Sequence, residues 1–318
     1  MRTFCTIISG NYFPHAVTLY KSLIKFNSDE QLMVLVCDEG EISPDPAGYS
    51  GIRIFKINDL NSYSITNILY NKYSSENTDA FRWSMKPVFL SWLLQNGYEK
   101  IIYTDCDIHF FNEYDFLFDE LNDAAVLLTP CWRTIDHNLN EEEFIDLYTD
   151  GLYNAGFIGA SRKGLPALEW WSQACSYKIE IDYKSGLFVD QKYLDVLSIA
   201  FDNIQITMNR GCNIAFWNQH ECKRISHGDI VLINNIYPII FIHFTDRYIK
   251  ELLEGNDHLI FPYYSQYEAT FKQTGFSLKN FIPGLPEYSK PSAFIKVKRK
   301  LLIRTRIKNF LFKLIDKI

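Results

Sequence analysis

The first hundred residues alternate short apolar runs with segments of helical periodicity. Three runs have the length and composition of β-strands, at residues 3–9, 32–37 and 52–57. Between the first two, the segment 16–26 places its apolar residues on one helical face. This alternation predicts an α/β protein with a mainly parallel twisted sheet flanked by helices on both faces. Ligands of such a sheet bind beyond the carboxyl ends of its strands.

The same pattern continues along the chain. Residues 138–150 are acidic, and we expect a helical or irregular insertion over the sheet. The other expected elements are strands at 100–104, 157–160 and 238–244, and helices at 86–94, 166–174 and 189–200.

The composition is that of a folded globular protein, with 47% hydrophobic and 22% charged residues. The seven cysteines are odd in number and lack CxxC spacing, which favours a reduced, cytoplasmic compartment. No apolar run approaches the roughly 18 residues that a membrane-spanning helix needs, so we expect a soluble or peripheral protein.

Charge is distributed unevenly. The whole chain carries −6, whereas residues 290–318 contain ten Lys/Arg and one acidic residue. Prolines at 283, 286 and 291 mark the passage between the two parts, so we expect one folded domain at 1–288 and a separate tail at 289–318. Apolar residues at 303, 307, 310, 314 and 318 recur at helical spacing, which predicts a basic amphipathic helix suited to an anionic membrane surface. A packed C-terminal helix or an oligomer contact is the alternative.

Two acidic residues follow the expected strand at 100–104. Asp105 and Asp107 are one residue apart, so both carboxylates can turn toward one cation where the chain leaves the strand. A hard divalent ion prefers such oxygen ligands, and a nucleotide diphosphate can complete its shell. A solvated turn is the alternative interpretation.

A histidine lies near the end of the apolar run at 238–244. His243 alone is more typical of a hydrogen-bonded core residue, but beside two carboxylates it becomes a candidate metal ligand. An imidazole among the ligands favours Mn²⁺, with Mg²⁺ as the alternative cation.

Several short motifs between residue 3 and about residue 250 resemble, in their order and spacing, those of one enzyme family. These are the retaining GT-A glycosyltransferases of the glycogenin and lipooligosaccharide galactosyltransferase type, family 8 or a close relative. Asp105, Cys106 and Asp107 resemble the family's metal motif, and His243 resembles its third metal ligand. The other matching positions are Ile8, Ser9 and Tyr12 in the nucleoside pocket, Arg82 to Lys86 at the helix that reaches the donor, Asn154 to Gly156 near the donor sugar, and Asp190 with Gln191 beside the anomeric centre.

The resemblance implies transfer of a hexose from a nucleotide-diphosphate sugar to a glycan or lipid-linked glycan acceptor with retention, and a UDP-sugar is the expected donor. It implies that Asp190 stabilises an oxocarbenium-like centre and that Gln191 orients the sugar. We further expect a role in bacterial surface polysaccharide synthesis, at the cytoplasmic face of the cell membrane. Nucleic acid is not among the expected partners.

The chain departs from the family after its His-Phe pair. The family usually continues with a glycine and a Lys-Pro that clamps the diphosphate, whereas residues 245–250 here read Thr-Asp-Arg-Tyr-Ile-Lys. A diphosphate needs at least one cation besides the metal, and the candidates are Lys86, Arg247 and Lys250.

Several positions and the function itself keep alternatives. Asn154 and Gly156 are also typical of a turn, Asp190 of a helix N-cap, and the candidate acceptor contacts Asn213 and Trp217 of simple packing. For the whole chain, one alternative is a sugar-nucleotide-binding module with weakened catalysis. A second is a metal-dependent nucleotidyltransferase, but residues 9–12 are not the Gly-rich basic loop of that class.

Overall fold

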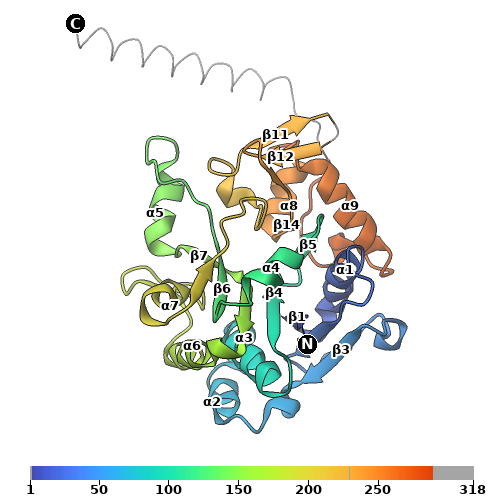
Figure 1. Ribbon diagram of the computed structural model, residues 1–318. Coiled ribbons are helices and arrows are strands. Elements are labelled where there is room, and N and C mark those ends of the chain that lie inside the picture. Colours follow the sequence, from blue (N-terminus) through green and yellow to red (C-terminus); the bar gives the residue numbers. More distant parts are fainter. Residues whose placement is uncertain (1, 229, 289–318) are drawn as a thin grey trace, which may run out of the picture.

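A computed structural model describes residues 2–228 and 230–288. In this part of the chain, a seven-stranded sheet runs in the order β10-β6-β7-β4-β1-β2-β3 (Figure 1). Only β7 runs antiparallel to its neighbours, so the expected mainly parallel α/β sheet is confirmed. The strands are β1 (Arg2–Ile8), β2 (Leu32–Val36), β3 (Ile52–Lys56), β4 (Lys100–Thr104), β6 (Val126–Pro130), β7 (Tyr153–Ser161) and β10 (Ile204–Ile206).

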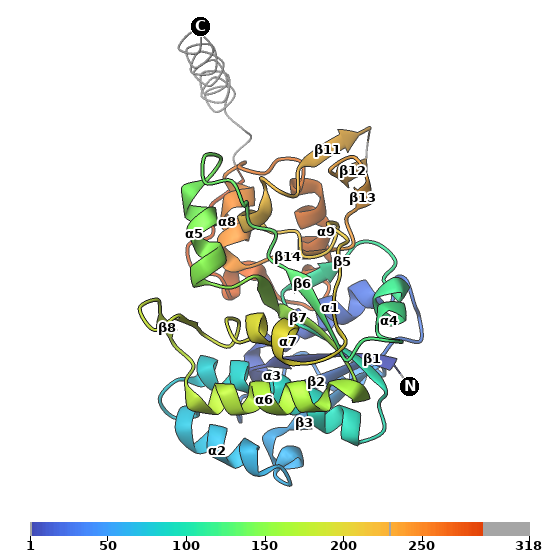
Figure 2. The same cartoon turned by 60° about the vertical axis from the view of Figure 1, so that its left-hand side comes forward.

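Helices cover both faces of this sheet. Figure 2 shows α2 (Ser64–Tyr73), α3 (Thr78–Gln95) and α6 (Leu165–Tyr177) gathered on one side. The side chains of β1 alternate between two cores: Cys5 and Ile7 pack with α2, α3 and α6, whereas Phe4 and Ile8 pack with α1 (Phe13–Leu23). Burial on both faces explains why β2 is an uninterrupted apolar run and why β1 carries only threonines among its buried polar residues.

A second layer of structure lies beyond the carboxyl ends of the strands. There β5 (Ile108–Phe110) pairs with β14 (Phe241–His243), next to α8 (Asp246–Leu253) and α9 (Phe261–Lys272), which share a third apolar core. A small antiparallel sheet contains β11 (Arg224–His227), β12 (Ile230–Ile233) and β13 (Tyr237–Pro238). The remaining elements are α4 (Asp115–Glu120), α5 (Glu141–Thr149), the hairpin β8 (Ile181–Asp182) and β9 (Leu187–Phe188), α7 (Leu194–Ala200), and short 3-10 turns.

Most of the expected elements are present with shifted ends. The insertion at 138–150 is the helix α5, whose N-cap Asn140 accepts a hydrogen bond from the Glu143 amide. Helix α3 starts eight residues before the expected position, because the Asn77 side chain caps it by accepting from the Ala80 amide. The single strand expected at 238–244 is divided between β13 and β14.

One expected helix boundary is wrong. The helix predicted over 189–200 begins at Leu194, with Tyr193 at its N-cap. Residues 189–193 form turns instead, so Asp190 is not a helix N-cap and that alternative is excluded.

Two expectations concern the membrane. Across residues 2–228 and 230–288, we find no helix that combines the length and apolar character needed to cross a bilayer. The tail at 289–318, with its expected amphipathic helix, lies outside the described residues.

Candidate metal and nucleotide-sugar site

Strand pairing assembles the cluster of Asp105, Asp107 and His243. The two acidic residues lie in the turn between β4 and β5, which is closed by a hydrogen bond from the Ile108 amide to the Asp105 carbonyl. The pairing of β5 with β14 places His243 opposite Ile108, beside Asp107. The predicted contact between the acidic pair and His243 is therefore present.

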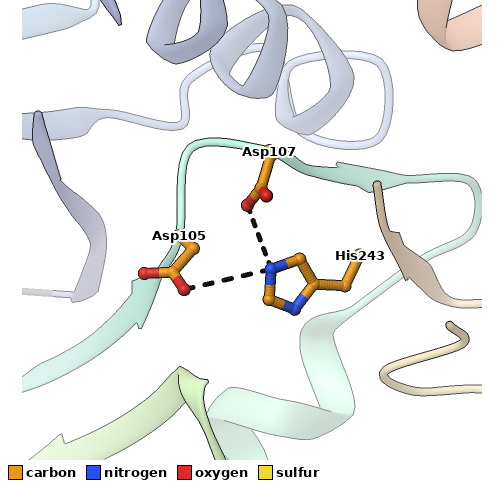
Figure 3. Close-up of side chains that lie close together, drawn as sticks. All are labelled: Asp105, Asp107 and His243. Atoms are coloured by element: carbon orange, nitrogen blue, oxygen red, sulfur yellow. Dashed lines mark ion pairs between the residues drawn. The ribbon is translucent and has the colours of Figure 1, made fainter. Parts of the chain in front are cut away.

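The three side chains point toward a common centre (Figure 3). His243 Nε2 lies 3.1 Å from Asp107 Oδ1 and 3.9 Å from Asp105 Oδ2, and one ligand atom from each residue falls within 4.8 Å of the others. The two carboxylate side chains are 30% exposed, whereas that of His243 is 7% exposed. Solvent therefore reaches the cluster from the side of its carboxylates, whereas the imidazole is buried in the protein.

The pKa values of His243 and Asp107 each depend on the charge of the other group. Burial by itself lowers the pKa of His243, but the carboxylates of Asp107 and Asp105 outweigh it and raise that pKa. Burial likewise raises the pKa of Asp107, and the His243 imidazole outweighs it and lowers that pKa. The cluster therefore favours positive charge at its centre.

The backbone of β7 approaches the cluster closely. A Cβ built on Gly156 would lie 2.7 Å from His243 Cε1 and 2.9 Å from Asp105 Oδ2. Two carboxylates and an imidazole in this arrangement fit a divalent cation.

Asp105 uses its two oxygens differently. Its Oδ1 accepts a hydrogen bond of 2.5 Å from the Tyr103 hydroxyl and lies 3.5 Å from Lys86 Nζ. Its Oδ2 is the atom that faces His243. One oxygen is therefore held by the protein and the other is directed to the centre of the cluster.

Lys86 is buried between two carboxylates. Its ammonium lies 3.1 Å from Asp190 Oδ2 and donates to the Ala155 carbonyl at 3.1 Å. Burial lowers the pKa of Lys86, but Asp105 and Asp190 outweigh it and raise that pKa, so the side chain stays charged. Burial and the nearby Asp105 raise the pKa of Asp190 despite the opposing charge of Lys86. Lys86, which the sequence predicted to bind phosphate, therefore lies between Asp105 of the cluster and Asp190.

Gln191 is fixed by hydrogen bonds to both sides of its amide. Its Oε1 accepts from Asn154 Nδ2 at 3.3 Å and from the Ala155 amide at 3.2 Å, and its Nε2 donates to the Asp150 carbonyl at 3.0 Å. Asn154 and Gly156 lie within β7, so the alternative that these residues form a turn is wrong.

A cavity of about 180 Å³ adjoins the acidic pair. Arg82 lines it, donating to Ser9 Oγ at 3.0 Å and pairing with Asp79 at 2.7 Å. Of the predicted nucleotide-sugar residues, the cavity is lined by Ile8, Ser9, Tyr12, Arg82 and Asp105, with the metal candidate Asp107 beside them. Sequence reasoning missed Tyr103, His15 and Asp246, which also line it. Tyr103 could have been found, because it precedes Asp105 by two residues and so shares its side of the chain.

The other predicted residues do not line this cavity. Six of them make the buried contacts described above, namely Lys86, Asn154, Gly156, Asp190, Gln191 and His243, and the remaining four are Asn213, Trp217, Arg247 and Lys250. Arg247 is exposed, pairs with Glu251 at 3.0 Å and covers the Phe216 ring; neither it nor Lys250 lines this cavity. Asn213 is fully buried and donates to the Pro130 carbonyl at 3.2 Å. The Trp217 ring is 9% exposed and meets His243 edge-on, with 5.5 Å between ring centroids.

No protein-family model matches the chain. Two proteins of Bacillus subtilis strain 168 are similar in sequence and are uncharacterised. YfnF is 28% identical over 261 residues, which cover 79% of this chain and 83% of YfnF. YfnD is 25% identical over 277 residues, which cover 85% of each chain.

Among solved structures, the galactosyltransferase LgtC in complex with donor and acceptor sugar analogues is 17% identical, with a TM-score of 0.47 over 77% of this chain and 87% of LgtC. Mouse xyloside xylosyltransferase 1 is 13% identical, with a TM-score of 0.49 over 78% of this chain and 99% of that protein.

Proposed function

We propose that this protein is a metal-dependent glycosyltransferase that moves a hexose from a nucleotide-diphosphate sugar to an acceptor hydroxyl. The observation that carries the proposal is the cluster of Asp105, Asp107 and His243 at the mouth of a cavity that also presents Ser9, Tyr12 and Arg82. A cation site beside an aromatic ring and a guanidinium suits a nucleoside diphosphate.

The three residues of the cluster would hold the divalent cation, with Mn²⁺ preferred over Mg²⁺ because of the imidazole. When bound, the cation supplies Lewis-acid stabilisation of the departing diphosphate. Arg82 would add positive charge on the nucleoside side, and Tyr12 would contact the base or ribose. Arg247 and Lys250 would reach the phosphates only by rearranging, because the cavity does not include them.

Asp190 and Gln191 would serve the sugar side of the site. The Asp190 carboxylate would stabilise positive charge that develops at the anomeric carbon, and Gln191 with Asn154 would orient the hexose. Lys86 would reduce the repulsion between the Asp190 and Asp105 carboxylates and hold both in position, since it contacts both. Trp217 and Asn213 remain candidates for the acceptor side, and we assign retention of configuration to the reaction.

The catalytic unit in this proposal is residues 1–288. We take a UDP-hexose as donor and a glycan or lipid-linked glycan of bacterial surface polysaccharide synthesis as acceptor. The basic tail at 289–318 would hold the protein on the anionic cytoplasmic face of the cell membrane, next to such an acceptor.

The direct test measures UDP release from a panel of UDP-hexoses by the full chain with Mn²⁺, with Mg²⁺ and with EDTA. We expect release that depends on the metal and is lost in Asp107→Ala. A donor that raises the melting temperature with Mn²⁺ but is never turned over, with or without glycan acceptors, would support the sugar-nucleotide-binding module instead. If no donor is turned over and no donor raises the melting temperature, both the transferase and the binding-module proposals are overturned.

The membrane role has its own test. The full chain is sedimented with anionic and with neutral liposomes at low and high salt, beside a chain ending at Tyr288. We expect salt-sensitive binding of the full chain to anionic liposomes only, because each Lys or Arg near such a surface contributes about 1 kcal/mol. Equal sedimentation of the two chains would contradict the role of the tail.

A further inference from the structure

We infer that Val189 and Trp171 are positioning residues that fix the carboxylate of Asp190 before any substrate binds. The inference rests on the proposed function for the importance of Asp190. It assigns a role to a strained backbone turn and to a buried indole, neither of which contacts the metal cluster.

The backbone of Val189 is strained. Its φ is +44°, in the left-handed region where a side chain branched at Cβ is a rare outlier. The other described non-glycine residues at positive φ are four asparagines, which tolerate this region well, and Trp132. Such a conformation is costly and persists only where its surroundings enforce it.

The surroundings of Val189 do enforce the turn. The Val189 amide donates to the Glu180 carbonyl at 2.9 Å, which ties the residue to the β8–β9 hairpin. The next carbonyl, that of Asp190, accepts from Trp171 Nε1 at 3.0 Å, and Trp171 is fully buried on α6. The Gln191 side chain then binds β7 through the Ala155 amide. Three consecutive residues are thus held by three separate elements.

In this arrangement the backbone carbonyl and the side-chain carboxylate of Asp190 contact different elements. Its carbonyl is directed to α6, while its carboxylate, on a residue that is 2% exposed, meets Lys86 at 3.1 Å. A regular helix over 189–200 would carry no such turn, so the departure from helical geometry is what directs the carboxylate to Lys86. A preorganised charge stabilises a transition state without reorganising during the reaction.

The test compares Val189→Gly and Trp171→Phe in the full chain, using the UDP-hexose that the wild type turns over. Glycine removes the steric strain at positive φ, so Val189→Gly should unfold at a denaturant concentration no lower than that of the wild type. Glycine also frees the backbone to adopt other conformations, so the Asp190 carboxylate should be held less firmly. The kcat of Val189→Gly should therefore fall on the order of tenfold or more, with KM for the donor changed less than twofold. Trp171→Phe keeps an aromatic ring but loses the N–H, and its kcat should fall similarly.

Two matched controls separate positioning from general effects. Asn203→Gly changes another positive-φ residue, at the start of β10, and Trp170→Phe changes the neighbouring, partly buried tryptophan of α6. Both should keep wild-type kcat. In an Asp190→Asn background, Val189→Gly and Trp171→Phe should lower kcat by less than twofold further, because they act through the carboxylate.

The inference is overturned if each substitution lowers kcat by the same factor in the Asp190→Asn background as in the wild type. It is also overturned if kcat is unchanged in both single variants. If the wild type turns over no donor, the proposed function fails first. Coupling between Trp171→Phe and Asp190→Asn can then still be measured in denaturant unfolding. Strictly additive shifts in the unfolding midpoint would show that the indole does not act on the Asp190 carboxylate, which would overturn the inference.

Discussion

His243 Nε2 lies 3.1 Å from Asp107 Oδ1 because the register of β5 with β14 sets His243 opposite Ile108. The candidate metal site therefore depends on a non-local strand pairing as much as on the acidic pair. The same pairing ties Phe244, through its amide, to the Asp107 carbonyl. Loss of a ligand side chain should leave these backbone bonds intact, which makes the ligands testable by substitution.

Asp107→Ala should abolish Mn²⁺-dependent nucleotide binding while leaving the fold intact. Asp105→Ala should do the same, although it also leaves the Tyr103 hydroxyl without its acceptor and removes one of the two carboxylates beside Lys86, so it should cost more stability. His243→Ala should weaken Mn²⁺ more mildly, because the two charged oxygen ligands remain. Calorimetric titration with Mn²⁺ and UDP measures all three. Full activity of either aspartate variant in chelator-treated buffer without added metal would show that the metal assignment is wrong.

Gly156→Ala should lower metal affinity by at least tenfold without removing any ligand. The added methyl would approach Asn154 Oδ1 and His243 Cε1 at 2.7 Å, closer than a carbon atom tolerates, so the cluster must open. Gly48→Ala is the matched control, since a Cβ there meets nothing within 4 Å. Equal Mn²⁺ titrations of the two variants and the wild type would place the cation elsewhere.

The sequence predicted the sheet and the acidic pair because both signals are local. Strands buried on both faces are continuous apolar runs, and Asp105 and Asp107 end one of them. The contact with His243 required the resemblance to a family, since no periodicity reports which distant strand pairs with β5.

The environment of Lys86 could not be predicted in this way. A lysine at the expected start of a helix suggests an exposed cation, but the Asn77 cap begins α3 at Thr78 and places Lys86 in the helix interior. There it is buried alongside Met85 and Phe89 and meets two carboxylates. The turn at Val189 escaped for a related reason: apolar spacing continued through 189–200, and the contacts that break the helix come from α6 and β8.

Asp190→Asn should lower kcat at least a hundredfold while changing donor affinity only a few fold. The amide keeps the size of the side chain but loses the charge that would face the anomeric centre, and such a group acts chiefly in the transition state. Asp195→Asn is the control, because Asp195 also accepts from a lysine, Lys192 at 3.0 Å, but on α7. Steady-state kinetics of the two variants, with unfolding curves for each, measure the difference. An unchanged kcat for Asp190→Asn would leave the residue a structural role only.

His15 should make the fold sensitive to acid. It is 4% exposed, packs against Phe271 and Phe281, and its Nδ1 has no hydrogen-bond partner among the described residues. Burial lowers its pKa from 6.5 to about 4, with Asp107 opposing the shift. Between these two values the unfolded chain binds the proton and the folded chain does not, so the free energy of unfolding falls as the pH falls through this window.

His15→Phe keeps a ring in this core and removes the titration, so the comparison isolates the histidine. Between pH 7 and pH 5 the wild type should lose about 2 kcal/mol more unfolding free energy than the variant, from the linkage between the two pKa values. Urea unfolding of both full-length proteins at each pH measures this difference, and any constant effect of the substitution cancels. Above about pH 7.5 the two stability profiles should run parallel, since His15 is then largely deprotonated in both the folded and the unfolded chain. An equal loss in both proteins on acidification would mean that His15 is protonated as readily in the fold as in the unfolded chain, and that water reaches its ring.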